Sequence, residues 1–149
     1  METIKGAGRI GPTRYMGYRV TWPLASLSIN RESITFSMWP IRYEFPKSAV
    51  LGLVTYLVGG FLSLRIVHRV PGHERWVLFS PINYSEVKDL ALANGWLIEP
   101  EGTEVHLPAE VSYSGWVSRF TWGAVVAGII AIVAGIIATL AAYHIVVGR

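Results

Sequence analysis

The stretch "AVLGLVTYLVGGFLSLRIVH", residues 49–68, decides between two kinds of fold. It could cross a membrane as a helix, or it could turn back on itself as a β-hairpin. The 17 uncharged residues between Lys47 and Arg65 are at the lower limit for a membrane-spanning helix. The central pair Gly59-Gly60 favours the hairpin, because two-residue hairpin turns need the positive φ angles that glycine adopts easily.

The residues on either side of that turn alternate as a hairpin requires. Pairing outward from the turn places Val58 opposite Phe61 and, further out, Leu51 opposite His68. One face then carries the residues expected in a hydrophobic core, namely Leu51, Leu53, Thr55, Leu57, Leu62, Leu64 and Ile66. A shift by one residue would carry Arg65 into that core, so the alternation fixes the register.

The other face of the hairpin carries an apolar surface near the glycine turn, formed by Tyr56, Val58 and Phe61 together with Val54. Exposed apolar patches usually mark a contact with a partner or a membrane. We therefore expect Tyr56, Val58 and Phe61 to bind a partner. The alternative is that another strand or the following linker covers them.

The segments around the hairpin continue the same two-residue period. They are "YRVTW", "LASLSI", "SITFSM" and "IRYEF" before it and "RWVLF" after it. The following stretch, "INYSEVKDLALANG", changes to helical spacing, with Ser85 as the expected N-cap and Gly95 as the stop. The sequence thus predicts a mainly β domain of seven short strands, capped by one C-terminal helix.

Seven antiparallel strands followed by one amphipathic helix resemble the pleckstrin-homology-like (PH-like) barrel or sandwich. The segments "WPLASLSINRESITF", "EFPKSAVLGL", "LRIVHRV", "RWVLFSP" and "VKDLALANGW" are similar to the bacterial PH-like domains found in small membrane proteins. The resemblance covers residues 15–98. It implies a non-catalytic scaffold that recognises lipid or protein. The turn from Asn30 to Ser33 has only one basic residue, which argues against specific binding of inositol phosphates.

The C-terminal stretch "TWGAVVAGIIAIVAGIIATLAAYHIVVGR" has no charged residue before Arg149. A helix from Trp122 to Tyr143 would cover roughly 32 Å, close to the hydrocarbon thickness of about 30 Å. Aromatic residues stand at both ends, as membrane interfaces favour. We expect a transmembrane helix over 120–147 that acts as a tail anchor. The domain before it would lie on the cytoplasmic side of a plasma or inner membrane.

Small residues in this segment repeat with a seven-residue period and would form one stripe along the helix. They are Ala124, Gly128, Ala131, Gly135, Ala138 and Ala142. Small residues let helix backbones approach closely in lipid. The stripe therefore predicts self-association or packing against a helix of another membrane protein.

The net charge of +3 is concentrated at the N-terminus. The first twenty residues hold one acidic residue and four basic ones, Lys5, Arg9, Arg14 and Arg19. We expect residues 1–14 to form a basic leader, and these four cations to meet anionic lipid headgroups. The alternative is a solvated terminus that binds nothing. Residues 99–119 contain four glutamates and are expected to form an acidic linker.

No pattern in the sequence indicates catalysis or a cofactor. Without cysteine, the chain has no disulfide, thiol nucleophile or cysteine-ligated metal. The segment "GAGRIG", residues 6–11, matches a dinucleotide-binding pattern, but Pro12 follows where that site needs a helix. The four histidines lack the spacing of a metal site. We therefore expect no enzyme activity, no cofactor, no metal and no nucleic-acid partner.

Two functions fit these observations. The first is a tail-anchored recognition module that holds a protein partner, or the membrane surface, at the cytoplasmic face. The alternative is an accessory subunit of a larger membrane complex, packed through the Ala/Gly stripe. A weaker third option is a lipid-handling enzyme or transfer factor that uses the open end of the barrel.

Overall fold

The structure, a computed structural model, describes residues 2–13, 17–103, 105, 111, 113 and 131–132. The chain divides into two compact units, Met1–Val117 and Ser118–Arg149. The described residues of the first unit form eight strands, one short 3-10 helix and one α-helix. They are β1 (Thr3–Gly11), β2 (Tyr18–Ile29), β3 (Ser33–Met38), β4 (Ile41–Pro46), the 3-10 helix Lys47–Ala49, β5 (Val50–Val58), β6 (Phe61–His68), β7 (Trp76–Pro81), α1 (Tyr84–Ala93) and β8 (Ile98–Glu99).

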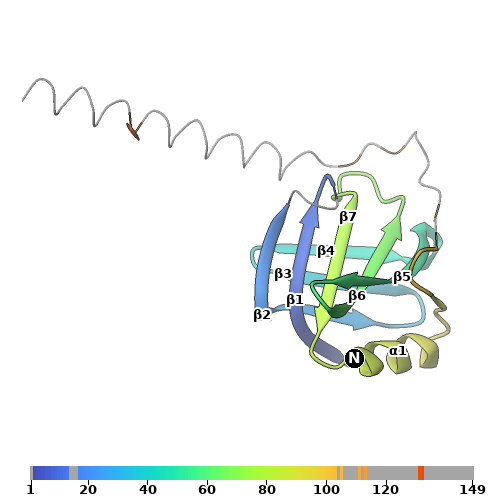
Figure 1. Ribbon diagram of the computed structural model, residues 1–149. Coiled ribbons are helices and arrows are strands. Elements are labelled where there is room, and N and C mark those ends of the chain that lie inside the picture. Colours follow the sequence, from blue (N-terminus) through green and yellow to red (C-terminus); the bar gives the residue numbers. More distant parts are fainter. Residues whose placement is uncertain are drawn as a thin grey trace, which may run out of the picture. The chain divides into compact units, whose positions relative to one another are not determined.

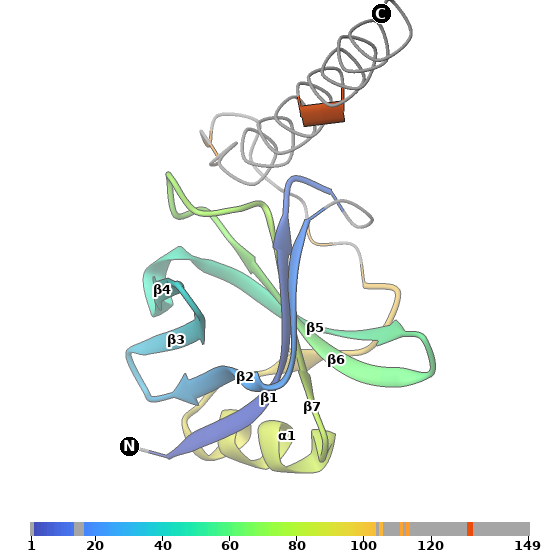
Figure 2. The same cartoon turned by 90° about the vertical axis from the view of Figure 1, so that its left-hand side faces the viewer.

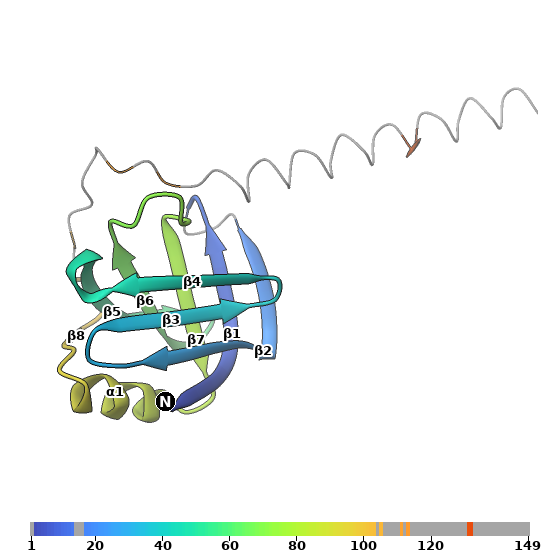
Figure 3. The same ribbon diagram turned by 180° about the vertical axis from the view of Figure 1, so that it is seen from behind.

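The strands form one sheet in the order β4-β3-β2-β1-β7-β6-β5-β8. All neighbours are antiparallel except β5 and the two-residue β8. The sheet curls into a half-barrel, with α1 across one end (Figures 1 and 2). Figure 3 shows β2, β3 and β4 on the opposite side of the barrel from the view of Figure 1. The expectation of a mainly β domain with one short helix is confirmed.

The core lies inside the curl of the sheet and is closed by α1. Phe36 of β3 and Phe79 of β7 meet edge to face across it, with ring centroids 6.4 Å apart. Val87 and Ala91 of α1 are fully buried against the same cluster. After the helix, Trp96 donates a hydrogen bond from Nε1 to the backbone oxygen of Asn30, at 2.6 Å. This bond ties the chain beyond α1 back to the turn between β2 and β3.

The N-terminal residues differ from the expectation of a separate leader over 1–14. Residues Thr3–Gly11 form β1, which lies between β2 and β7 near the middle of the sheet. The segments "YRVTW" and "LASLSI", expected as two strands, belong to the single strand β2. The register between β1 and β2 shifts between Gly6 and Gly8. Such an irregularity bends the two paired strands, in keeping with the curl of the sheet.

The hairpin in residues 49–68 is confirmed. Val58 pairs with Phe61 across the turn, and Gly59 and Gly60 have φ angles of +57° and +86°. The expected register holds as far as Gly52 and Val67. Beyond it, an irregularity before Gly52 shifts the pairing, so Val50 and not Leu51 lies opposite His68.

Helix α1 begins two residues earlier than expected. Asn83, and not Ser85, is the N-cap, and its side chain accepts a hydrogen bond from the backbone nitrogen of Ser85. Gly95 has a φ of +74°, so the expected glycine stop is confirmed.

The described residues include no helix that is long and apolar enough to cross a membrane. The expected transmembrane segment, 120–147, lies outside the described residues except for 131–132. The same holds for Arg14 and for every member of the Ala/Gly stripe other than Ala131.

Candidate functional site

The tip of the β5–β6 hairpin exposes large apolar side chains on both of its faces. Phe61 is 71% exposed, and Leu57 and Leu62, which pair across the hairpin, are each 44% exposed. Figure 2 shows the hairpin projecting from the rest of the sheet. Leu57 and Leu62 were expected in the core, but they lie outside it at the exposed end of the hairpin.

The three residues expected to bind a partner do not form one uniform patch. The side chain of Phe61 is exposed to solvent, and that of Val58 is half-buried. Tyr56 turns toward Trp76 of β7 and meets it edge to face, with ring centroids 5.9 Å apart. Val54, expected beside them, is buried. The exposed apolar surface is therefore the tip itself, and Tyr56 belongs to a neighbouring group of residues.

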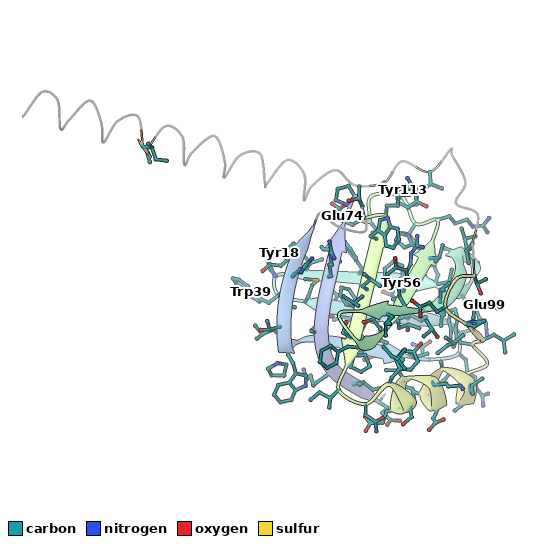
Figure 4. The ribbon with its side chains drawn as sticks, viewed as in Figure 1. Tyr18, Trp39, Tyr56, Glu74, Glu99 and Tyr113 are labelled. Carbon is teal, nitrogen blue, oxygen red and sulfur yellow. The ribbon has the colours of Figure 1, made fainter. Side chains whose placement is uncertain are left out.

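That neighbouring group is built on the face of the sheet opposite the core. The guanidinium of Arg65 lies over the ring of Trp76, with its central carbon 3.6 Å from the ring centroid. Such a stack fixes the direction of the guanidinium and adds a cation–π attraction. Figure 4 shows Tyr56 in front of the strands that carry this stack. A hydrogen bond between Ser63 and Ser80, at 2.6 Å, satisfies the two hydroxyls beside it.

Two of the arginines expected to meet lipid headgroups, Arg9 and Arg19, lie on this same face. Arg9 of β1 pairs in register with Arg19 of β2 on one side and with Leu78 of β7 on the other, and Leu78 in turn pairs with Arg65. Since direct partners on neighbouring strands share a face, the three arginines form one row across the sheet. We name Arg9, Arg19 and Arg65 the arginine row. Lys5 is also in β1 and is exposed.

Arg9 and Arg65 of the arginine row are partly buried and lack part of their hydrogen bonding, whereas Arg19 is exposed. Burial lowers the pKa of Arg65 and of Arg9, and the nearby charge of Arg19 lowers the pKa of Arg9 further. Within the described part of the chain, Nε and Nη2 of Arg9 and Nε of Arg65 are buried with no hydrogen-bond partner. Buried donors of this kind cost free energy unless an acceptor reaches them.

A second polar group lies at the end of the barrel away from α1. Burial lowers the pKa of His68 to about 4, and the ring packs against Phe45 and His73. Burial, together with the nearby charge of Glu74, raises the pKa of Tyr43 to about 12. Both side chains are therefore neutral near pH 7. Among the described residues, no group of three or more His, Asp or Glu could hold a metal ion.

The chain after β8 returns to the sheet. The side chain of Glu101 accepts a hydrogen bond from the backbone nitrogen of Leu57, at 3.2 Å. A Cβ on Gly52 would lie 3.1 Å from Val105. The hydroxyl of Tyr113 donates a hydrogen bond to the backbone oxygen of His68, at 2.7 Å. Three residues of the expected linker, Glu101, Val105 and Tyr113, therefore lie against β5 and β6, whereas Phe61 stays exposed.

The glycines of "GAGRIG" serve packing. A Cβ on Gly6 would come within 2.6 Å of the ring of Phe79, and one on Gly8 within 2.9 Å of Phe36 and of Ala25. The segment lies within β1, which continues to Gly11, and does not lead into the helix that a dinucleotide-binding site requires. The close approach of the central strand to the core aromatics accounts for these glycines.

No protein-family model matches the chain, and no curated protein or solved structure does so either. The PH-like resemblance therefore stays a prediction.

Proposed function

We propose that this chain is a recognition module that holds a protein partner at a membrane surface, with the tip of the β5–β6 hairpin as its principal contact. The observation that carries the proposal is the exposure of Phe61, Leu57 and Leu62 at a projecting turn. A two-residue glycine turn with apolar side chains on both faces offers a partner a narrow anchor that can enter a pocket.

The half-barrel followed by one helix is compatible with a PH-like domain, and we infer that it is one. That fold supports the proposal because a PH-like domain serves as a binding scaffold. The apolar segment over 120–147 would hold the domain at the membrane, and the partner would be a protein that works there.

The test is photo-crosslinking in cells from a photoreactive amino acid placed at Phe61. Leu97 is the matched control position, because it is 76% exposed and follows α1. We expect a discrete protein adduct from position 61 and none from position 97. The Phe61→Ser variant should lose co-purification of that protein, whereas Leu97→Ser should retain it.

Adducts with lipid alone from position 61 would contradict the proposal, since they would mean that the tip enters the bilayer. Equal adducts from positions 61 and 97 would also contradict it, because the tip would then have no preference over another exposed apolar side chain.

A further inference from the structure

A second group of exposed apolar side chains lies away from the hairpin tip. Trp22 and Leu24 of β2 are 54% and 60% exposed, and Trp39, in the turn between β3 and β4, is 79% exposed. We name these three residues the tryptophan edge. Figure 4 shows the side chain of Trp39 pointing away from the domain, beside Tyr18. In Figure 2, β3 and β4 lie on the side of the domain opposite the β5–β6 hairpin, so the two exposed surfaces are distinct.

The register of the sheet brings this edge about. The pairing of β2 with β1 shifts here, so that residues 21–24 lie opposite a single residue of β1. All four are exposed, because a bulge turns side chains out of the regular alternation. On the other side of β2, Ala25 pairs with Met38, and Leu24 and Trp39 are the next residues beyond that pair. The sheet thus brings Leu24 and Trp39 together from two separate segments.

Two exposed arginines flank Trp39. Arg19 follows Tyr18, whose hydroxyl donates a hydrogen bond to the backbone oxygen of Trp39, at 3.2 Å. Arg42 lies three residues after Trp39, at the start of β4, and Glu44 is two residues further along that strand. Neither β2 nor β3 contains an acidic residue. The exposed charges nearest to Trp39 along these strands are therefore positive.

The charges at the other end of the edge are mixed. Lys5 lines one pocket together with Trp22, Glu2 and Glu86. The excess of cations among the described residues is thus confined to the Trp39 end, and this end is the one suited to an anionic surface.

A bilayer that contains anionic lipid fits the combination at the Trp39 end. Tryptophan rings favour the depth of the headgroups, and arginines beside them are attracted to anionic phosphates. The hairpin tip has neither feature, since residues 55–64 include no tryptophan and no charged side chain. The two exposed apolar surfaces therefore suit different partners.

The length of the chain keeps the domain within reach of a bilayer, and here the inference rests on the proposed anchor at 120–147. The hydroxyl of Tyr113 donates a hydrogen bond to the backbone oxygen of His68, which ties the chain to the domain seven residues before that anchor begins. Such a stretch extends over about 25 Å at most, less than the diameter of a small domain, about 30 Å. An anchored domain would thus meet lipid at high effective concentration.

From these observations we infer that the tryptophan edge docks on the surface of a bilayer containing anionic lipid. Trp39 and Leu24 lie at the depth of the headgroups, and Arg19 and Arg42 contact the phosphates. The β5–β6 hairpin, on the opposite side from β3 and β4, stays available to a protein partner (Figure 2).

The experiment uses the full chain in vesicles of phosphatidylglycerol and phosphatidylcholine. Because the sequence has no cysteine, a single introduced cysteine carries the only fluorophore. The labelled positions are Leu24→Cys on the edge and Leu97→Cys as the matched control, since Leu97 is also an exposed leucine. Ile132→Cys reports on the proposed anchor. We expect lipids that carry a nitroxide to quench the fluorophore at positions 24 and 132 and not at 97, and iodide in the water to quench mainly at 97.

Two further substitutions, made in the Leu24→Cys chain, test the named contacts. Trp39→Ser should remove most of the quenching by lipid. Arg42→Gln should lower the ratio of docked to free domain about fivefold, because one cation near an anionic surface is lost. Arg31→Gln is the matched control, since it removes the same charge from the β2–β3 turn at the other end of these strands and should leave the quenching unchanged. Circular dichroism checks the fold of each variant.

Equal quenching by lipid at positions 24 and 97 overturns the inference. Protection of position 24 from iodide without quenching by lipid also overturns it, because protein and not lipid would then cover the edge. Quenching at position 132 without quenching at 24 means that the docking fails while the anchor stands. No quenching at 132 means that the anchor fails, and the docking with it. The crosslinking from position 61 is measured independently, so failure of the hairpin contact is distinguishable from both.

Discussion

The buried imidazole of His68 predicts how the stability of the domain depends on pH. Its Nδ1 accepts a hydrogen bond from the backbone nitrogen of Val70, at 3.2 Å, and its Nε2 lies 2.9 Å from the backbone oxygen of Glu74. Since the backbone N–H can only donate, Nδ1 carries no proton and Nε2 donates to Glu74. A second proton would have to enter on Nδ1, against that N–H, in a site closed to water.

The pKa of His68 falls from 6.5 to about 4, mainly through burial and further through the charges of His73 and Arg65. In the unfolded chain the imidazole takes up a proton near pH 6.5, whereas in the folded chain it does so only near pH 4. Between these values the unfolded state binds more protons, so falling pH favours unfolding. The full stability is present above pH 6.5, and roughly 3 kcal/mol of it has been lost once pH 4 is reached.

The assay is urea unfolding followed by tryptophan fluorescence at pH 7 and pH 5. Between these values the wild-type chain should lose about 2 kcal/mol more stability than the His68→Gln variant, which cannot titrate there. His73→Gln is the control, because that ring is only half-buried and its removal should leave most of the pH dependence. If His68→Gln keeps the wild-type difference between the two pH values, the argument from burial is wrong.

Three substitutions test the packing that positions the sites, by the free energy of unfolding in urea. Gly6→Ala should destabilise the domain by about 2 kcal/mol or more, because its methyl group would meet the buried ring of Phe79; a neutral effect would refute the close packing of β1. Asn83→Ala should cost about 1 kcal/mol through loss of the N-cap, and an unchanged midpoint would argue against that cap. Trp96→Phe should cost about 1–2 kcal/mol, since the backbone oxygen of Asn30 loses its donor; equal stability would mean that this bond contributes nothing.

The parts of the fold set by local pattern could be predicted from the sequence. The two-residue alternation around Gly59-Gly60 predicted the hairpin and most of its register, and the helical spacing of "INYSEVKDLALANG" predicted α1 and its glycine stop. The irregularity before Gly52 could not be foreseen, because it depends on how β5 meets the rest of the sheet. The same limit applies to the cap, where Asn83 and Ser85 are both suitable residue types.

Strand β1 was missed because its sequence, "TIKGAGRIG", has three glycines and no long alternating run. Its glycines are explained by contacts with Phe79 and Phe36, which are distant in sequence. The arginine row could not be predicted either, because it also depends on residues that are distant in sequence. Arg9, Arg19 and Arg65 belong to three strands, and only the register of the sheet brings them onto one face. The concentration of basic residues near the N-terminus was visible in the sequence. That Arg9 and Arg19 share one face of a sheet could be inferred only once residues 3–11 were known to form a strand.

The central position of β1 has a practical consequence for expressing this domain. On one side of β1 lie β2, β3 and β4, and on the other lie β7, β6 and β5. A fragment begun at Tyr15, at the domain boundary suggested by sequence pattern, would leave two blocks of strands with no shared neighbour. It would also expose the edges of both blocks to association with other chains. During synthesis, β1 leaves the ribosome before β7, so its pairing on that side of the sheet has to wait until residues 76–81 have followed.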